Sequence, residues 1–415
     1  MRIAVVGAGI SGLVTAYLLA RRHEVHVFEA LDAIGGHTRT ERVSHGGKQY
    51  AVDTGFIVFN TWTYPNFTRL MQTLGVASRP TRMSFGVWDE PSGIQYAATT
   101  LAGLYATRRA RWSPSHHRMV LEILRFSRTA QAALDRSEPD VSLRELLDQG
   151  RYGEAFRERF VVPMAAAIWS ADRREILDGP ARFFLRFFEH HAMLSLIDQP
   201  VWRTIVGGSQ SYVAPLTARF HDRIALERPV RAVRRRASAV ELAFDDGPAT
   251  SFDQVVLACH SDQSLALLAD PSPEEREVLG ALRYQENEAV LHTDDSVLPP
   301  APRARAAWNY HVTGRGEGPV AVTYDMNRLQ GLEADVTFCV TLNRHDRIDP
   351  RRILRRTTYH HPVFDRAAVR AQSRFEHISG VGQTHYAGAY WYSGFHEDGV
   401  RSALRVARRF GSFLQ

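Results

Sequence analysis

The sequence predicts an α/β fold in which a Rossmann-type nucleotide-binding domain is joined to a second, α+β lobe. A glycine-rich turn between two short apolar strands within residues 2–29 predicts the first domain. Residues 83–200, which change from a hairpin to helices, predict a lobe of different character. With 415 residues the chain is too long for one small core, so two lobes are expected.

The nucleotide-binding turn lies at the start of the chain. Arg2–Val6 is short and β-branched, as expected for a buried parallel strand. A G-x-G-x-x-G motif at residues 7–12 opens a helix over roughly 11–22, and a second strand, Glu24–Phe28, leads to Glu29. Strand, helix, spacing and acidic residue together predict a dinucleotide site rather than an empty glycine turn.

Each residue type in this motif has an expected role. Gly7 permits the tight turn, Gly9 lets backbone amides approach a pyrophosphate, and Gly12 allows the helix to pack on the sheet. Glu29 is placed to accept hydrogen bonds from an adenosine ribose. The neighbouring residues complete the predicted contacts: Ile10, Ser11 and Ala30.

Further strands and helices follow along the chain. Residues 85–97 predict a hairpin and residues 119–200 are mostly helical. Four phenylalanines within residues 183–188 indicate a core stripe, or else one wall of a long apolar pocket. The later strand predictions are two strands within 227–247 with a turn at Asp245-Asp246-Gly247, a buried strand at Val255–Cys259, and alternating strands and turns over Leu291–Leu342.

The composition excludes several classes of function. The formal net charge is +6, but acidic residues are interspersed with the arginines and no nucleic-acid-binding module is readable. The densest basic patch, residues 108–112, predicts either a solvated loop or contact with an anionic lipid surface. No window is apolar and long enough for a membrane span or a secretion signal. We therefore expect a cytoplasmic protein, with peripheral contact at the inner membrane surface left open.

Three adjacent histidine pairs raise the question of a metal site. Neighbours on a chain point apart, and no pair has a second liganding pair nearby at helical spacing, so no metal centre is expected. Hydrolysis is not expected either, because no Gly-x-Ser-x-Gly turn is present and Ser209 has no base partner in sequence. The three pairs are His116-His117, His190-His191 and His360-His361.

Two stretches resemble the flavin-containing amine oxidase superfamily, which includes monoamine oxidases, phytoene desaturases and protoporphyrinogen oxidase. One is GGHTRT, which begins at Gly35; the other is VDTGF, residues 52–56. The superfamily pattern Arg-x-Gly-Gly-Arg-x-x-Ser/Thr is matched at its glycines and its hydroxyl, but Ala33 and His37 replace the two arginines. Arg39 is the candidate to replace their contacts with the phosphates of FAD.

The resemblance implies a discontinuous FAD-binding Rossmann-type domain of the glutathione-reductase-like kind. Its expected segments are residues 1–82, 204–266 and 376–415, and residues 83–203 and 267–375 would form the substrate-binding domain. Besides the glycine motif and Glu29, it implies FAD contacts at Gly35, Gly36, His37, Thr38, Arg39, Thr54, Gly55, Phe56, Val230 and Ala258.

The segment YAGAYWYSGFHEDGVRSAL, from Tyr386, is expected to meet the flavin ring. In the superfamily an Ala-Gly pair, here Ala387-Gly388, ends a strand beside the flavin, and a helix then begins, here near Glu397–Val400. The N-terminus of that helix would stabilise negative charge on the reduced ring. Asp398 has two interpretations, a helix N-cap or a catalytic acid. The implied contacts are Gly388, Phe395, Glu397, Asp398, Gly399 and Val400.

Several departures separate the chain from amine oxidases. Ala389 replaces the usual acidic residue, and Phe395 lies where one tyrosine of the amine-holding aromatic cage is expected. Lys48, the only lysine, lies in a glycine-rich turn, and we do not expect it to be the lysine that these enzymes place near flavin N5. The C-terminal motif lacks the cysteine that links flavin covalently, so non-covalent FAD is expected.

A narrower resemblance runs from end to end. Residues 52–76, 83–87 and 394–404 resemble the flavoprotein domain fused to plant cyclopropane fatty acid synthases and its free-standing bacterial relatives. It implies an FAD-dependent oxidoreductase that takes a hydride from a lipid-like substrate, such as a methylated or cyclopropanated acyl chain. Two alternatives stay open: an amine oxidase that produces hydrogen peroxide, and a flavin-bound partner of a lipid methyltransferase without turnover of its own. The candidate proton acceptors are His396, Asn309, Tyr310 and His311.

Overall fold

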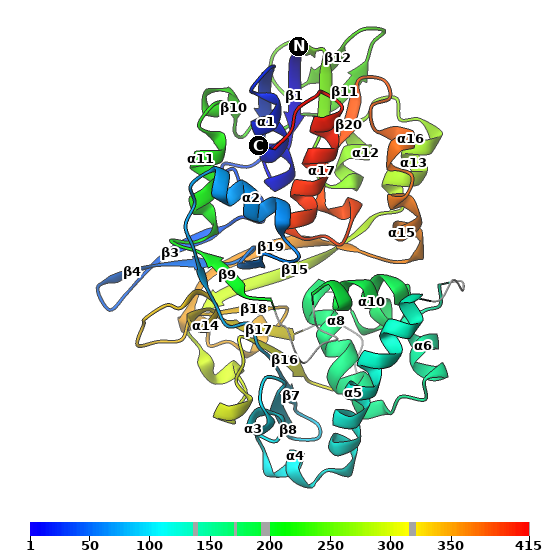
Figure 1. The fold of residues 1–415 in the computed structure, drawn as a ribbon. Coiled ribbons are helices and arrows are strands. Elements are labelled where there is room, and N and C mark those ends of the chain that lie inside the picture. Colours follow the sequence, from blue (N-terminus) through cyan, green and yellow to red (C-terminus); the bar gives the residue numbers. More distant parts are fainter. Residues whose placement is uncertain (136–139, 170–171, 192–199, 315–320, 415) are drawn as a thin grey trace.

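The computed structural model describes residues 1–135, 140–169, 172–191, 200–314 and 321–414. The chain forms two lobes, which are upper and lower in the view of Figure 1, and both termini lie in the upper lobe. Two long paired strands, β15 (Arg283–His292) and β19 (Ile353–Val363), run across the molecule between the lobes.

A five-stranded parallel sheet forms the centre of the upper lobe, in the order β10-β2-β1-β14-β20. β1 (Arg2–Val6) lies in the middle, between β2 (Glu24–Phe28) and β14 (Gln254–Leu257). The edges are β10 (Ile224–Ala225) and β20 (Thr384–Tyr386). Because all five strands are parallel, their carboxyl ends meet at one edge, which is where ligands bind in open α/β sheets. The predicted α/β fold is confirmed.

Two helices from opposite ends of the chain pack together beside this sheet (Figure 1). All ten residues of α1 (Ile10–Leu19) are buried, which explains why its sequence is apolar on every side. α17 (His396–Arg408) buries one face and turns its arginines outward. The remaining helices of this lobe are α2 (Pro65–Thr73), α11 (Val213–Thr217), α12 (Ser261–Leu267), α13 (Pro273–Gly280), α15 (Arg366–Gln372) and α16 (Phe375–Ile378).

A three-stranded antiparallel sheet shares the core of the upper lobe and contains the two strands predicted within residues 227–247. β11 (Ala232–Arg235) pairs with β12 (Val240–Ala243), and β12 pairs with β13 (Thr250–Phe252). The predicted turn at residues 245–247 follows β12 and leads to a third strand, β13, which was not predicted. The apolar alternation of β13 is only three residues long, too short to be recognised from the sequence.

The lower lobe is built on a seven-stranded sheet, in the order β19-β15-β18-β17-β16-β7-β8. All neighbours are antiparallel except β16 and β7. The predicted hairpin at 85–97 and the predicted strands within 291–342 are both present in this sheet. Its shorter strands are β7 (Phe85–Asp89), β8 (Ile94–Ala97), β16 (Trp308–Val312), β17 (Ala321–Asp325) and β18 (Cys339–Leu342).

Helices cover one side of this sheet, as predicted for the described part of residues 119–200. The phenylalanine stripe lies on α10 (Ala181–His190), where Phe184, Phe187 and Phe188 are buried in a core shared with α8 (Val162–Trp169). The other helices of the lobe are α3 (Leu101–Leu104), α4 (Arg108–Trp112), α5 (Pro114–Asp135), α6 (Leu143–Gln149), α7 (Glu154–Phe156), α9 (Arg173–Asp178) and α14 (Met326–Gln330). Among the described residues, no helix is both long and apolar enough to cross a membrane.

The basic patch at residues 108–112 is a short helix, α4, and not the predicted loop. Thr107 caps the helix by accepting a hydrogen bond from the amide of Ala110, and Ala110 is buried. The indole of Trp112 is 83% exposed. A threonine cap followed by one small buried residue is enough to order this segment, although its arginines dominate the sequence.

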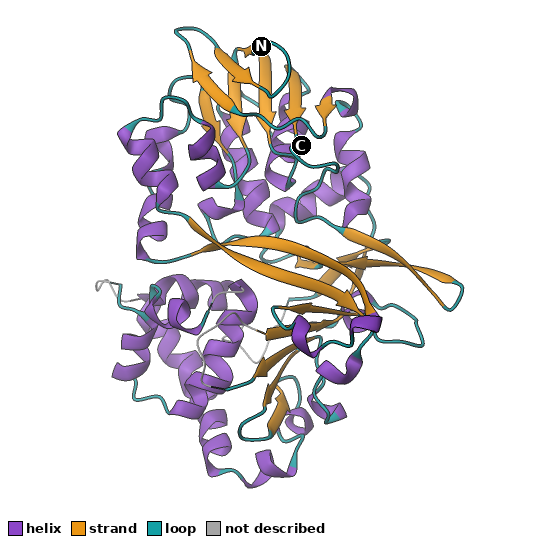
Figure 2. Ribbon diagram, turned by 180° about the vertical axis from the view of Figure 1, so that it is seen from behind, coloured by secondary structure: helices purple, strands orange, loops and turns teal. Residues whose placement is uncertain are grey.

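Short strands connect the lobes and form a projecting hairpin. β5 (Val58–Asn60), β9 (Trp202–Ile205) and β6 (Ser78–Pro80) form one small sheet. β3 (Thr40–His45) and β4 (Lys48–Asp53) form a hairpin that extends away from the body in both views (Figures 1 and 2).

Candidate functional site

The glycine loop between β1 and α1 has the close contacts that its motif predicts. A Cβ atom added at Gly7, whose φ is +103°, would lie 2.9 Å from the carbonyl oxygen of Ala258, the residue after β14. A Cβ atom at Gly12 would lie 1.9 Å from the carbonyl oxygen of Gly7. At Gly9, in contrast, no atom of the described residues lies within 4 Å of the added Cβ. The loop is closed toward the sheet and open at Gly9.

The open position is lined by donors and by Glu29. Gly9 is the N-cap of α1 and no side-chain hydrogen bond caps this helix, so its first amides are available to an anion. The Glu29 carboxylate accepts hydrogen bonds from the amides of Ala8, at 2.7 Å, and Leu31, at 3.1 Å. The backbone of Gly36 packs closely against Gly9, because a Cβ atom at Gly36 would lie 3.2 Å from the Cα of Gly9. This arrangement fits the pyrophosphate and ribose of a dinucleotide.

Of the other predicted FAD contacts, Val230 and Ala30 lie close to Glu29, whereas the Arg39 side chain is engaged elsewhere. The amide of Arg228 donates to the carbonyl of Glu29 at 2.9 Å, which brings the buried Val230 close to this strand end, and Ala30 is exposed beside it. The guanidinium of Arg39, in contrast, pairs with Glu41 at 2.8 Å, and that bond raises the pKa of Arg39. Arg39 is therefore already engaged within the protein.

The N-terminus of α17 meets the N-terminus of α1. A Cβ atom at Gly399 would lie 2.6 Å from Ile10 Cγ2 and 3.0 Å from Ser11 Oγ, so only glycine allows this approach. Val400 is fully buried beside it. Two helix N-termini thus converge at the carboxyl end of the parallel sheet, where developing negative charge would be stabilised.

Gly388 serves a purpose that the sequence did not reveal. Gly388 is one of the implied FAD contacts, but its amide donates to Ser402 Oγ at 2.9 Å and so serves to dock α17. A Cβ atom at Gly388 would lie 2.1 Å from the ring of Tyr390. The glycine is needed so that this buried ring can fold back on the chain.

The acidic pair at the start of α17 is occupied by backbone amides. Asp398 is not the N-cap, which is Phe395; it is the third helical residue, and it accepts hydrogen bonds from the amides of Ser393 and Phe395, both at 3.1 Å. Burial raises the pKa of Asp398 to about 6. Glu397 accepts from the amides of Asn66, at 3.2 Å, and Phe67, at 2.8 Å, at the start of α2. Both carboxylates hold the helix in place, which leaves neither of them directed at a substrate.

His396 lies at the centre of a buried polar contact set. Its ring stacks on Phe56 with centroids 3.7 Å apart, and its Nε2 lies 2.9 Å from Thr38 Oγ1 and 3.2 Å from Tyr212 OH. Burial lowers the pKa of His396 well below its usual value, so the imidazole is neutral. Tyr212, which also hydrogen-bonds Thr38, was missed from the sequence; its only signal is its position three residues after the turn Gly207-Gly208-Ser209.

Backbone contacts join the two stretches that resemble the superfamily, residues 35–40 and residues 52–56. The amide of Phe56 donates to the carbonyl of His37 at 2.8 Å, and a Cβ atom at Gly55 would lie only 2.1 Å from that oxygen. The amide of Gly35 donates to the carbonyl of Ala8 at 2.8 Å. Thr54 Oγ1 lies 2.9 Å from Tyr359 OH, which links these stretches to β19.

A group of four histidine side chains lies beside Gly55 and Tyr359. His37 lies 5.5 Å from His361 between ring centroids, and His260 lies 6.0 Å from His360. Burial lowers the pKa of His37 and of His260 to about 4, and that of His361 to about 3. Within the described ranges, no group of three or more histidine, cysteine, aspartate or glutamate side chains could hold a metal ion.

Asp53 was also missed, although it lies inside a quoted motif. Its buried carboxylate accepts hydrogen bonds from Thr40 Oγ1 at 2.6 Å, from the amide and hydroxyl of Ser209 at 2.8 and 2.9 Å, and from Gln330 Nε2 at 2.9 Å. Burial raises the pKa of Asp53 to about 6. Asp53 thereby fastens the glycine-pair turn to the β3–β4 hairpin.

Among the described residues, no hydrogen bond or ring contact joins the candidate proton acceptors on β16 to His396. Tyr310 and His311 are neighbours on one strand, so they point to opposite faces, and β17 and β18 separate that strand from β15. His311 stacks on Trp88 with centroids 4.0 Å apart. The side chain of Asn309 is held by the backbone of Ala306.

Phe395 belongs to an aromatic cluster. It stacks on Phe187 of α10 with centroids 4.8 Å apart and lies 6.4 Å from Trp169 of α8. The indole of Trp169 donates to the carbonyl of Ser393 at 3.1 Å. The start of α17 is thus bound directly to the phenylalanine stripe. The interpretation of the stripe as core is confirmed, whereas its role as one wall of an apolar pocket stays a prediction.

Comparison with known proteins agrees with this geometry. The model of the family "Flavin containing amine oxidoreductase" matches residues 10–303. A protein of Mycobacterium tuberculosis, "Putative flavin-containing monoamine oxidase AofH", is 26% identical over 339 residues, which are 78% of this chain and 70% of that protein.

Solved structures show the same fold. Cyclohexylamine oxidase from Brevibacterium oxydans matches with a TM-score of 0.71 at 15% identity, over 99% of both chains. A CLA-producing fatty acid isomerase from P. acnes matches with a TM-score of 0.69 at 15% identity, over 99% of this chain and 98% of that one. The glycine loop, the two converging helices and the family match together lead to one conclusion: the chain belongs to the flavin-containing amine oxidoreductase family.

Proposed function

We propose that this FAD-dependent oxidoreductase binds FAD without a covalent link and takes a hydride from an apolar, lipid-like substrate. The observation that carries the proposal is the packing of Phe395. The position expected to hold one tyrosine of an amine-binding cage is a phenylalanine that stacks on Phe187 and adjoins Trp169. Such a surface favours hydrocarbon and offers an ammonium group no hydroxyl.

The residues of the upper lobe fit FAD. The amides at the start of α1 suit its pyrophosphate, Glu29 suits its ribose, and the N-terminus of α17 suits a ring that becomes negatively charged. When bound, FAD supplies a two-electron acceptor for the hydride, while the accompanying proton passes to the protein or to water. The neutral imidazole of His396 is held rigidly by Phe56 and Thr38, which suits a positioning role beside the ring.

Lys48 supports the same proposal. This single lysine lies exposed at the start of β4, next to the turn of the β3–β4 hairpin. A lysine there does not suit the role that amine oxidases give to a lysine near flavin N5. A fold shared with a fatty acid isomerase is further support, since the same fold accommodates acyl chains in that protein.

A second candidate, an amine oxidase that produces hydrogen peroxide, is favoured by one observation. The M. tuberculosis relative that carries the name of a monoamine oxidase covers 78% of this chain. The two candidates differ in the chemistry of the substrate and share the cofactor site.

Anaerobic mixing of the protein with each class of substrate distinguishes the two candidate functions. The FAD-loaded protein is mixed with phospholipids that carry methylated or cyclopropane acyl chains, and separately with putrescine and benzylamine, while the visible flavin absorbance is followed. We expect bleaching with lipid only. Bleaching should be slower in Phe187→Ala, whose ring stacks on Phe395, than in the matched variant Phe184→Ala, whose ring packs on Trp169. Bleaching with an amine and none with lipid would overturn the proposal. Bound FAD that no compound reduces, in a protein that co-purifies with a methyltransferase, would instead support the partner hypothesis.

A further inference from the structure

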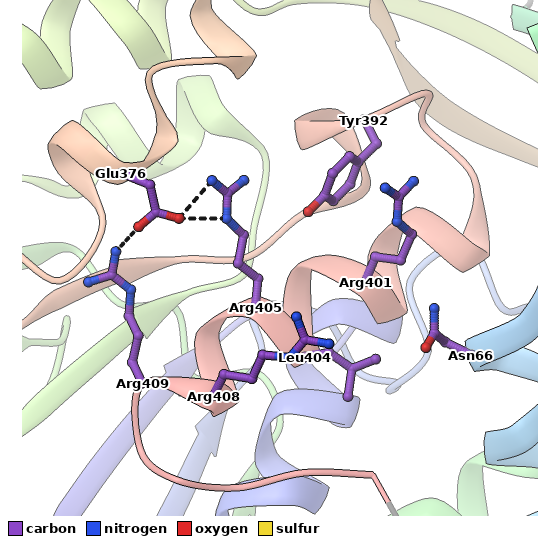
Figure 3. Close-up of a pocket in the computed structure, with 8 residues that line it drawn as sticks. All are labelled: Asn66, Glu376, Tyr392, Arg401, Leu404, Arg405, Arg408 and Arg409. Atoms are coloured by element: carbon purple, nitrogen blue, oxygen red, sulfur yellow. Dashed lines mark hydrogen bonds and ion pairs between the residues drawn. The ribbon is translucent and has the colours of Figure 1, made fainter. Parts of the chain in front are cut away.

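A hollow lined by arginines lies on the outer side of α17, away from the buried core of the upper lobe (Figure 3). Its volume is about 570 Å³, within the range of small-molecule sites. The side chains that matter to its chemistry are Arg401, Arg405, Arg408, Arg409, Asn66 and Tyr392. None of these residues takes part in the dinucleotide contacts described above.

Helical spacing places the four guanidinium groups together. Residues 401, 405, 408 and 409 follow one another at intervals of four, three and one, so they share one face of α17 and its C-cap. The opposite face is buried against α1 and the sheet. Arg405 and Arg408, in the last turn, complement the helix dipole, whereas Arg401 is the sixth residue of the helix and lies outside its last turn. The helix dipole therefore does not account for all four arginines.

The charge within the hollow is not balanced by the protein. Glu376 is the one carboxylate in the lining, and it bridges Arg405, at 2.7 Å, and Arg409. Arg401 pairs with the buried Asp398 at 3.2 Å and lies over the Tyr392 ring at 4.0 Å. Arg408 is exposed, and among the described residues it has no ion-pair partner. Figure 3 shows the four side chains spread around the same space.

We propose that this hollow is a second ligand site, which binds a ligand that carries phosphate ester groups. Planar guanidinium forks match phosphate oxygens in pairs, and several of them around one space suit a ligand with more than one charge. Tyr392 and Leu404 add apolar surface for the part of the ligand next to the phosphate. The phosphate chemistry is shared by a phospholipid head group and by a soluble phosphorylated metabolite. The site goes beyond the proposed function, because it lies apart from the FAD contacts.

The test uses FAD-loaded protein, so that the pyrophosphate-binding loop at Gly9 is already filled. Inorganic pyrophosphate is titrated by calorimetry, and co-sedimentation is measured with vesicles of phosphatidylglycerol and of phosphatidylcholine. The variants are Arg408→Glu and Arg408→Gln. The matched control is Arg42→Glu, which makes the same charge change at an exposed position on the β3–β4 hairpin. The visible flavin spectrum reports that each variant keeps its cofactor site.

We expect the wild-type protein and Arg42→Glu to bind equally, and Arg408→Glu to bind at least about tenfold more weakly, with Arg408→Gln between them. Binding of pyrophosphate without vesicles indicates a soluble phosphorylated ligand. Binding of phosphatidylglycerol vesicles, with phosphatidylcholine vesicles left unbound, indicates a lipid head group. The proposal is overturned if neither probe binds, if Arg408→Glu binds as well as the wild type, or if Arg42→Glu loses as much affinity as Arg408→Glu.

Discussion

At the scale of single residues, His396 shows how one side chain can join distant parts of a chain. Its ring connects Thr38, from the first family-like stretch, with Tyr212, from the return to the upper lobe, and it stacks on Phe56. Because burial keeps the pKa of His396 far below its usual value, these contacts are made by a neutral ring with one donor and one acceptor nitrogen.

Replacing His396 should therefore cost stability through lost hydrogen bonds. His396→Phe keeps the stack on Phe56 but removes the imidazole partner of two buried hydroxyls, which are left with only their bond to each other. We expect a loss of about 1–3 kcal/mol in the free energy of unfolding. His396→Gln keeps a polar atom in reach and should lose less. Urea unfolding of both variants measures the difference. Equal stability of the two would show that the hydroxyls of Thr38 and Tyr212 satisfy each other.

Lys48 allows a prediction about the chemistry. Since its side chain is exposed on the hairpin, Lys48→Met should leave the rate of flavin reduction by the substrate unchanged. Stopped-flow absorbance with whichever substrate bleaches the flavin measures this rate. A large decrease, in a variant that still binds FAD, would mean that the lysine reaches the flavin and that the argument against amine oxidation is wrong.

At the scale of elements, different glycines of the loop between β1 and α1 are expected to serve FAD binding and folding stability. Gly9 has an extended backbone with φ −76°, and no described atom lies near an added Cβ, so Gly9→Ala should leave the stability of FAD-free protein nearly unchanged and weaken FAD binding. In Gly12→Ala the methyl group would collide with the Gly7 carbonyl, and we expect the unfolding free energy to fall by about 2 kcal/mol or more.

Urea unfolding of FAD-free protein and fluorescence titration with FAD measure the two effects separately. If Gly9→Ala binds FAD as tightly as the wild type, the FAD pyrophosphate does not bind at this loop. A Gly12→Ala variant of normal stability would show that α1 can shift along the sheet.

The sequence was most informative where backbone geometry leaves little choice of residue. The βαβ element at 2–28 was predicted because three glycines, two β-branched strands and one acid have a fixed spacing. The hydrogen-bond partners of individual side chains could not be predicted in the same way, because the spacing of residues along the chain does not determine them. Asp398 was expected to cap α17 because acids are favoured there, but the N-cap position is Phe395 and the acid reaches back from the third helical residue. Asp53 and Tyr212 find partners more than 150 residues away, which no local pattern encodes.

At the scale of the whole molecule, buried histidines determine how stability responds to acid. Seven of them have pKa values lowered from 6.5 to about 4 or, for one, about 3, chiefly by burial: His37, His191, His260, His292, His311, His385 and His361. The unfolded chain binds protons at these residues from about pH 6.5 downward, whereas the folded protein does not until near pH 4. Unfolding therefore takes up protons in this window.

We accordingly expect the free energy of unfolding to fall as the pH falls from about 6.5 to about 4. Asp53 and Asp398, whose pKa values are raised to about 6, act in the opposite direction, but they are fewer. Urea unfolding across this pH range measures the slope, and His361→Phe should make it shallower. A stability that stays level or rises on acidification would mean that the carboxyls outweigh the imidazoles.

The pairing of β1, β14 and β20 also has a consequence for the time at which the protein becomes active. Strand β1 leaves the ribosome long before α17, which lies against α1 but follows it some 380 residues later in the chain. At about 5–20 residues per second, the nascent loop at Gly9 waits roughly 20–80 s for the helix that completes its pocket. Flavin loading is thus a late event in synthesis, and a nascent chain stalled before residue 384 should emerge colourless.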